Sequence, residues 1–585
     1  MKKTKKYFFK LISWKFFPYF LFFIFALISV YPSLVGNYHY GDDIHFHLSA
    51  IKTYADGLPF SFCYKVFENI TYNFGFGMGL FYPPLPHIVG AIIYKVVSIF
   101  GIGINCADTI FHIVTLFFIG SSMFILAKKV FDDDKKACLA GLFYMTYNYV
   151  YVDVIMRDAM NESFIFIFIP IIFLGLWYLL KENNTKMFYI FFIFGYICLM
   201  YSHLVLAVYF TLFLFVFLLV FVRNIFIKEK FIPLLISTFI ILIFTSTFYV
   251  PMIEHKLFGN YVVFLNRTMS LEDVWYMPLE GFYKYYSYLS NADYGGLIYA
   301  NFNAVVLVFL FLGFYKIITK KVPDNRWNFM IGIILFGVVA LIFETIPMIW
   351  PHMPSILLSI QFVWRLSTFV GFAVCFVAVE GIDSILNMFK KKYIYAVLIF
   401  IVLLLGNFTL QNVNRTVIND ISAIFSGNYS YYDITREHFP VKAYKNMEYL
   451  KKRNHDIKIV KGNADVEMIS NDVPSMKFKL SHLNSKTIVQ LPRLYYLGYK
   501  ITNSKGETIK YHEDKYGFIT LTVSENDVYE VKYEGTIGYK IATILKILML
   551  LCVFCVVCKR YTKKHEIFNK IKIVGKFKIC NLKKH

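Results

Sequence analysis

The chain has 585 residues, of which 58% are apolar, 20% are aromatic and only 17% are charged. Repeated apolar runs approach the roughly 20 residues that a helix needs to cross a bilayer, which excludes a soluble globular protein. The formal net charge is +22, but lysine and arginine gather at the N-terminus, in short loops and after Lys559. The positive-inside rule predicts this distribution, whereas a nucleic-acid-binding face requires a continuous basic surface. Nucleic acid is therefore not an expected partner.

The predicted elements are mainly membrane-spanning helices. Hydropathy places about 12 spans at 17–35, 110–127, 137–152, 163–180, 187–202, 203–222, 231–250, 302–318, 328–346, 366–387, 393–410 and 540–558. We expect the apolar run 84–100 to lie at the outer interface or to be re-entrant, because every basic loop then falls on one side. This topology predicts a multi-pass plasma-membrane protein with both termini in the cytoplasm. Residues 1–410 are expected to form the transmembrane domain, with a large first outer loop at 36–109 and another at 251–300.

The polar region 411–537 is predicted to be an extracytoplasmic domain. Residues 434–455 have a helical pattern, and runs such as "MKFKL" (476–480) and "ITLTV" (519–523) then alternate apolar and polar residues. Period-two alternation between turn-forming clusters is typical of antiparallel strands. We expect a polytopic α-helical membrane protein with a small β-rich outer domain. Segment 538–585 is predicted to contain the last span and a basic cytoplasmic tail.

The stretch "GDDIHFHLSAIKTYADG" (41–57) follows the first span and has the densest set of titratable side chains. Its apolar residues recur at i, i+4 and i+7, which predicts an amphipathic helix on the membrane surface. Asp42 can cap that helix, whereas Asp43 and His47 are four residues apart and share one face. A capped interfacial helix accounts for one aspartate but not for both. The alternatives are a general base, for which we favour Asp43, or a divalent cation (Mg²⁺ or Mn²⁺) held by Asp42, Asp43 and His47.

A second group of charges lies in the predicted outer turn "YVDVIMRDAMNES" (151–163). It comprises Asp153, Arg157, Asp158 and Glu162. Charges this close to hydrocarbon are costly and indicate a functional site. Arg365 begins a later span and His203 lies in a turn, and each taken alone is explained as an interfacial anchor or a polar turn residue. Arginine at headgroup depth suits a lipid phosphate, which it binds through paired hydrogen bonds. We therefore assign Arg157, Glu162, Arg365 and His203 to lipid-phosphate binding.

Five segments carry a family resemblance: "DDIHFHLSAI", "GFGMGLFYPPLPHIVGAI", "MRDAMNESFIFIFIPIIFLGL", "QFVWRL" and, in the outer domain, "YYLGYKITNSKGE". Together they resemble the GT-C superfamily of membrane glycosyltransferases, and within it bacterial proteins of the YfhO type or those called "6-pyruvoyl-tetrahydropterin synthase-related". The resemblance covers essentially the whole chain. It implies that Asp42 or Asp43 is the catalytic acid of the first loop and that residues 157–162 form the second functional loop. The chain departs from the family by having Ala50, with Lys52 nearby, where a basic residue is expected. Its histidines lack a three-ligand zinc pattern, so no pterin chemistry is expected.

The predicted function is transfer of a hexosyl or pentosyl group from a polyprenyl-phosphate-linked donor to an extracytoplasmic glycan, polymer, lipid or protein acceptor. The active site is expected on the outer face of the cell membrane, in contact with membrane lipids. An aspartate removes the acceptor proton, while Arg157 and Arg365 stabilise the departing lipid phosphate, with inversion at the anomeric carbon. A transporter or flippase for a lipid-linked precursor is one alternative, although it predicts charged or broken helices at mid-membrane. A non-catalytic cell-envelope scaffold is the other.

Overall fold

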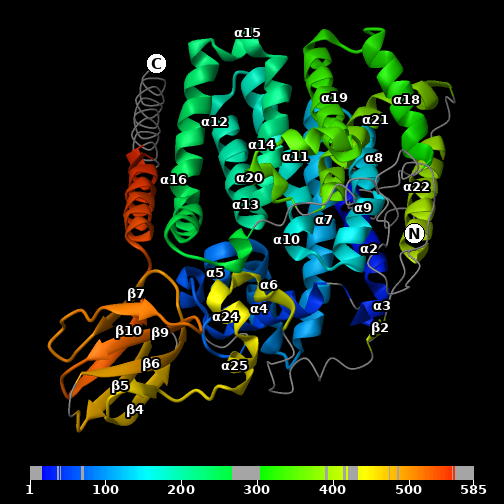
Figure 1. Cartoon of the computed structure of the whole chain (residues 1–585). Helices are drawn as coiled ribbons and strands as arrows, with labels where there is room; N and C mark the ends of the chain where they lie inside the picture. Colours follow the sequence, from blue (N-terminus) through cyan, green and yellow to red (C-terminus); the bar gives the residue numbers. More distant parts are fainter. Residues whose placement is uncertain are drawn as a thin grey trace, which may run out of the picture.

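The structure is a computed structural model that describes residues 16–35, 38–39, 41, 43–67, 72–265, 304–360, 362–388, 393–412, 417–418, 433–472, 475–483, 486–556 and 558–559. Asp42, one of the predicted site residues, lies outside these residues. Most of the predicted outer loop 251–300 and the start of the predicted outer domain also lie outside them. Within the described residues, a bundle of helices stands above a smaller region of β-sheet (Figure 1).

The helical part contains long apolar helices together with short connecting ones. The bundle helices are α2 (Phe17–Ser29), α7 (Ile104–Phe131), α8 (Asp134–Met145), α9 (Asn148–Tyr151), α10 (Met160–Ser163), α11 (Ile165–Leu180), α12 (Thr185–Phe188), α13 (Phe194–Ser202), α14 (Leu204–Leu219), α15 (Val222–Ile225), α16 (Lys228–Phe258), α18 (Ala304–Ile318), α19 (Asp324–Thr345), α20 (Ser355–Leu358), α21 (Ser367–Met388) and α22 (Tyr393–Asn412). Among the described residues, 7 helices are long and apolar enough to cross a membrane, and shorter apolar helices accompany them. The chain is thus a multi-pass helical membrane protein, whereas the count of about 12 spans stays a prediction.

The core of the bundle is built from aromatic rings. Phe173 of α11 contacts Phe210 and Phe217 of α14 edge-to-face and stacks on Phe372 of α21 at a centroid distance of 4.8 Å. Phe336 of α19 closes the same cluster at 5.3 Å from Phe173. Such ring pairs contribute packing energy beyond the area that they bury. The cluster holds four helices together and leaves α11 almost wholly buried.

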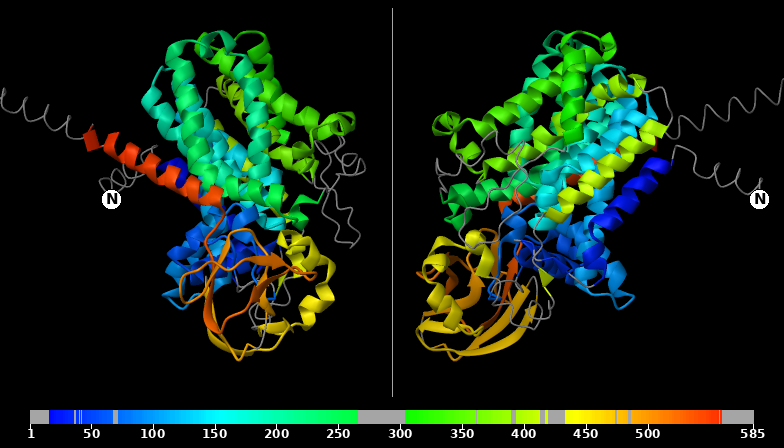
Figure 2. Two further views of the ribbon diagram at one scale, coloured as in Figure 1. Left: turned by 60° about the vertical axis from the view of Figure 1, so that its left-hand side comes forward. Right: turned by 90° about the vertical axis from the view of Figure 1, so that its right-hand side faces the viewer.

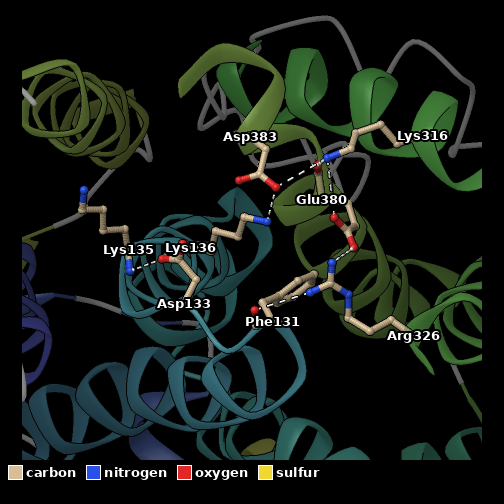
Figure 3. A network of polar contacts seen from close by, with 8 residues as sticks. All are labelled: Phe131, Asp133, Lys135, Lys136, Lys316, Arg326, Glu380 and Asp383. Carbon is tan, nitrogen blue, oxygen red and sulfur yellow. Dashed lines mark hydrogen bonds and ion pairs between the residues drawn. The ribbon is translucent and has the colours of Figure 1, made fainter. Parts of the chain in front are cut away.

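The basic connections of the bundle meet at one end. Lys136 in the first turn of α8 forms an ion pair with Asp383 of α21, and Nζ of Lys316 in α18 lies 3.6 Å from the same carboxylate (Figure 3). Nη2 of Arg326 in α19 lies 3.0 Å from Oε1 of Glu380, which is buried. Figure 1 shows the connection between α18 and α19 at the end of the bundle away from the sheets. Under the positive-inside rule this end is expected to face the cytoplasm.

The C-terminal part forms two four-stranded antiparallel sheets, with orders β4-β5-β10-β7 and β3-β6-β9-β8. The strands are β3 (Lys458–Lys461), β4 (Asp465–Asp472), β5 (Ser475–Ser481), β6 (Thr487–Leu494), β7 (Tyr499–Thr502), β8 (Tyr511–Glu513), β9 (Phe518–Val523) and β10 (Asp527–Tyr533), preceded by the short helices α24 (Val441–Lys445) and α25 (Met447–Lys452). A further short pair joins β1 (Tyr38–His39) to β2 (Val417–Ile418). Met476, Phe478 and Leu480 of β5 are all buried, as their alternation predicts. The predicted β-rich region is confirmed.

The sheets and the first loop share one hydrophobic core, although they are far apart in sequence. The first loop contains α4 (Ile44–Asp56), α5 (Met78–Phe81) and α6 (Leu85–Ser98), which Figure 1 shows between the bundle and the sheets. The backbone amide of Leu494 donates to the carbonyl of Phe74 at 2.7 Å, and the Tyr496 hydroxyl donates to the carbonyl of His438 at 3.0 Å. Phe76 of the first loop packs in the same core. The C-terminal region therefore forms a cover over the first loop.

The chain leaves the sheets through a last apolar helix, Ile537–Val556. This helix lies at the edge of the molecule (Figure 2). Only 6% of its most apolar 18-residue stretch is buried. At its start, the backbone amide of Gly538 donates to Oε1 of Glu254 in α16 at 2.9 Å. The exposed apolar surface of this helix is suited to lipid.

Candidate functional site between the first loop and the bundle

The charged turn between α8 and α11 is buried within the protein. After α9, residues Val152–Met156 make one wide helical turn, in which the amide of Arg157 donates to the carbonyl of Val152 at 2.8 Å. Such π-turns are frequent at functional sites. Asp158 then adopts a positive φ of 54°, which reverses the chain before α10. Asp153, Arg157, Asp158 and Glu162 are each at most 6% exposed.

Glu162 is the centre of the polar network in this turn. Its Oε2 accepts a hydrogen bond from Nη1 of Arg157 at 3.0 Å and lies 3.1 Å from Nε of Arg365, which comes from the segment before α21. Its Oε1 accepts a hydrogen bond of 2.5 Å from the hydroxyl of Tyr149. Nη1 of Arg157 also donates to Oδ1 of Asp153 at 2.7 Å. The structure thus brings together the predicted Arg157, Glu162 and Arg365 and orients both guanidinium groups through one carboxylate.

Burial and neighbouring charge set the protonation of this network. Burial, together with the negative charge of Glu162, raises the pKa of Asp153 well above its usual range. Burial opposes the charge on Arg157, but Glu162 and Asp153 outweigh it and keep the pKa of Arg157 above its usual value. The predicted His203 lies near the same charges. Burial, and then the positive charge of Arg365, lower the pKa of His203 to about 3. At neutral pH the network therefore contains a neutral His203, and burial favours the uncharged form of Asp153 over its carboxylate.

Asp43 reaches the same site from the first loop. Its backbone amide donates to the carbonyl of Arg157 at 3.0 Å. Its carboxylate is close enough to act on Arg157 and on Tyr82, where burial and then the Asp43 charge raise the pKa of the phenol. Gly41 lies directly on the turn, since a Cβ at this position would be 2.2 Å from Cβ of Asp158. The stretch 41–57, called the acidic loop from here on, is therefore in direct contact with the charged turn.

The structure corrects one step of the sequence-based argument. Helix α4 begins at Ile44, so the residue at the cap position is Asp43 and not Asp42, and the Asp43 side chain makes no capping hydrogen bond. The preference for Asp43 as the base rested on Asp42 being the cap, and that reasoning was wrong. The support for Asp43 comes instead from its closeness to Arg157.

His47, a predicted metal ligand, is paired with a second histidine. Its Nδ1 is 2.8 Å from Nε2 of His87 on α6, and both rings are buried. Burial, and then the charge of His87, lower the pKa of His47 well below its usual range. The pair connects α4 to α6 and is more readily explained as packing between these helices.

Several residues at the site were missed by sequence reasoning. Tyr149 carries no distinguishing signal among 45 tyrosines. Asp108 and His112 occupy the first turns of α7, and they form with Asp158 a group whose potential ligand atoms all lie within 4.8 Å of one another. Their spacing of four residues at the start of an apolar helix is a signal that was available in the sequence. Among the described residues, this is the group that can hold a metal ion by geometry.

The fold and the site define a multi-pass helical membrane protein with a C-terminal β-sheet region. Its buried charged site lies between the first loop and the helical bundle. No family model matches the chain, and no curated protein matches its sequence. The crystal structure of ArnT from Cupriavidus metallidurans bound to undecaprenyl phosphate is similar over 62% of this chain and 59% of ArnT, with 14% identity and a TM-score of 0.39. The cryo-EM structure of the arabinofuranosyltransferase AftD from Mycobacteria is similar over 68% of this chain and 27% of AftD, with 10% identity and a TM-score of 0.43. The chain thus spans less than two thirds of either protein, and likeness of this degree leaves its activity to be argued from its own residues.

Proposed function

We propose that the chain is a GT-C-type membrane glycosyltransferase that moves a sugar from a polyprenyl-phosphate-linked donor to an extracytoplasmic acceptor. One observation carries the proposal: Asp43 of the first loop lies beside Arg157, and Arg157 shares the Glu162 carboxylate with Arg365. These groups come from three segments far apart in the sequence. A base beside one arginine, with a second arginine held on the same carboxylate, suits transfer from a lipid phosphate.

The proposed reaction is a single displacement. The Asp43 carboxylate removes the proton of an acceptor hydroxyl, whose oxygen then attacks the anomeric carbon of the donor. The bond between this carbon and the phosphate oxygen breaks, and polyprenyl phosphate leaves with the electron pair. Arg157 and Arg365 stabilise the negative charge on the leaving phosphate, because guanidinium groups bind phosphate oxygens in pairs. Attack opposite the leaving group inverts the anomeric centre.

Glu162 and Asp153 act as positioning residues in this scheme. Glu162 contacts both arginines, so neither side chain needs to reorganise as charge develops. Asp153 also accepts a hydrogen bond from Arg157, and its raised pKa limits the negative charge that competes with the substrate phosphate. Less negative charge beside Arg157 leaves its guanidinium group better able to bind the lipid phosphate.

The membrane orientation supports an outer-face reaction. The charged site adjoins the first loop, which lies between the bundle and the sheets, whereas the connection between α18 and α19 lies at the opposite end of the bundle (Figure 1). If the basic end faces the cytoplasm, the site lies on the side of the outer leaflet, and both termini are predicted to be cytoplasmic. The C-terminal sheets then cover the site from outside, where an acceptor glycan or polymer arrives.

A divalent cation on Asp42, Asp43 and His47 stays a prediction. Nδ1 of His47 contacts Nε2 of His87 at 2.8 Å, so Nε2 is the ring nitrogen of His47 that such an ion would use. No step of the proposed reaction is routed through such an ion.

The test is sugar release from labelled polyprenyl-phosphate sugars by the purified chain in lipid. Asp43→Asn is expected to lower turnover by roughly 10²–10⁴-fold, the usual contribution of a general base, with donor binding retained. The matched control is Asp56→Asn at the other end of α4, because Asp56 forms an exposed ion pair with Lys52 at 2.6 Å. This variant should retain wild-type turnover.

Other outcomes identify the alternatives. Equal activity of Asp43→Asn and wild type would remove Asp43 as the base. Movement of the labelled lipid across vesicles without sugar release would identify a flippase. If a broad donor panel is neither consumed nor moved, a non-catalytic scaffold is the better description.

A further inference from the structure

A buried group of metal-ligand side chains lies behind the acidic loop. Asp108 and His112 are four residues apart and share one face of α7, while Asp158 comes from the charged turn. All three side chains are buried, with at most 6% of each residue exposed. None of the three was among the metal ligands predicted from the sequence.

The distances within this group match the spacing of ligands around one ion. Nε2 of His112 lies 2.8 Å from Oδ1 of Asp158 and 3.8 Å from Oδ1 of Asp108. Two ligand atoms each about 2.1 Å from a shared cation are roughly 3.0–3.4 Å apart at octahedral or tetrahedral angles. One observed distance lies just below this range and the other just above it. Small movements of the side chains would therefore place all three ligand atoms around one ion.

Unsatisfied oxygens point to a missing cation. Oδ1 of Asp108 and Oδ2 of Asp158 are buried and accept no hydrogen bond in the described part of the chain. His112 pairs with Asp158, so Asp108 is left with a buried oxygen whose loss of water no hydrogen bond offsets. A divalent cation with neutral His112 balances both carboxylates and occupies both free oxygens.

We propose that Asp108, His112 and Asp158 bind a first-row divalent cation of the Mn²⁺ or Zn²⁺ type. One imidazole nitrogen with carboxylate oxygens is a ligand set that suits these ions better than Ca²⁺, which prefers oxygen ligands alone. The site is separate from the reacting atoms of the proposed transfer. Its existence does not depend on the transferase proposal, because it is tested by binding.

The cation has a structural consequence for the acidic loop. It ties the charged turn to α7 through Asp158, and Asp158 is the residue on which Gly41 packs. The neighbouring Arg157 carbonyl accepts the hydrogen bond from the amide of Asp43 at 3.0 Å. Bound metal would therefore hold the turn that positions Asp43, which makes the three ligands positioning residues.

The experiment measures Mn²⁺ binding to the purified full chain in lipid nanodiscs after removal of metal with EDTA. Free Mn²⁺ is followed by electron paramagnetic resonance, and the bound ion is examined for coupling to an imidazole ¹⁴N nucleus. We expect one Mn²⁺ per chain with ¹⁴N coupling, displaced by Zn²⁺. Asp108→Asn should weaken binding at least tenfold, and His112→Gln should remove the ¹⁴N coupling. The matched controls are Asp56→Asn and His482→Gln, because both side chains are well exposed.

Two results would overturn the proposal. One is a wild-type chain that binds neither Mn²⁺ nor Zn²⁺ stoichiometrically. The other is binding that Asp108→Asn and His112→Gln leave at the wild-type affinity. If these variants do not fold, thermal unfolding of the wild type with and without Mn²⁺ decides the question. A raised midpoint together with ¹⁴N coupling supports the site, and the lack of either refutes it.

Discussion

Replacing Glu162 by glutamine tests whether one buried carboxylate holds the two arginines in place. Glutamine has nearly the same shape but carries no charge. Oε2 of Glu162 accepts a hydrogen bond from Arg157 at 3.0 Å and lies 3.1 Å from Nε of Arg365. Oε1 accepts a hydrogen bond from the Tyr149 hydroxyl at 2.5 Å. The glutamine oxygen can face the arginines while its amide group faces Tyr149, so the change mainly removes the charge.

The expected loss of stability follows from this geometry. Removing one partner of a buried ion pair costs roughly 3–5 kcal/mol, because a charge is left without compensation. The glutamine oxygen still accepts a hydrogen bond and Asp153 remains near Arg157, so we expect the lower end, about 3 kcal/mol. Sugar transfer should fall as well, since Arg157 and Arg365 lose the group that orients them.

Reversible unfolding of the chain in mixed micelles measures the stability change. The control is Glu182→Gln, because Glu182 pairs with Lys129 at 2.8 Å on the exposed basic end of the bundle. An exposed pair contributes at most about 1 kcal/mol, so this variant should remain close to wild type. If both variants lose the same stability, or Glu162→Gln loses none, the argument for a central buried carboxylate is refuted.

Two further predictions concern the acidic loop and the cover above it. Gly41→Ala is expected to lower turnover at least tenfold, since its Cβ would lie 2.2 Å from Cβ of Asp158 and 3.0 Å from the backbone carbon of Arg157. For His438, burial among aromatic rings lowers the pKa to about 3, so the unfolded chain takes up a proton first as pH falls below about 6.5. This histidine therefore contributes a stability loss of about 2 kcal/mol between pH 6.5 and 5, which His438→Asn should abolish when unfolding is measured at both pH values.

Each of these predictions has a matched control. Gly103→Ala should behave like wild type, because no atom lies within 4 Å of the added carbon. Wild-type turnover of Gly41→Ala would show that the loop does not need its contact with the turn. The matched substitution for the histidine is His482→Asn, at an exposed position. Parallel pH curves for His438→Asn and wild type would show that the buried ring is not the group that titrates.

Local patterns in the sequence were sufficient to predict which segments form helices and which form strands. Apolar runs as long as a bilayer is thick predicted the multi-pass helices, since a backbone in lipid must satisfy its hydrogen bonds within the helix. Alternation in 476–480 predicted a strand with one buried face, as the structure has it. The cost of charge near hydrocarbon indicated a site in the turn of Arg157 and Glu162, and the structure brings Arg365 to the same carboxylate.

Partners across long sequence separations were decided only by the tertiary structure. A helical pattern shows on which face of α4 His47 lies. It does not show that His87 of α6 contacts His47 there. The same holds for Asp158, which lies beside His112 only because the charged turn folds back onto α7. The backbone amide of Asp43, the residue before α4, likewise contacts the Arg157 carbonyl of the charged turn, a partner that the pattern of α4 does not show. Periodicity determines the faces of each element, whereas packing between elements determines which side chains face one another.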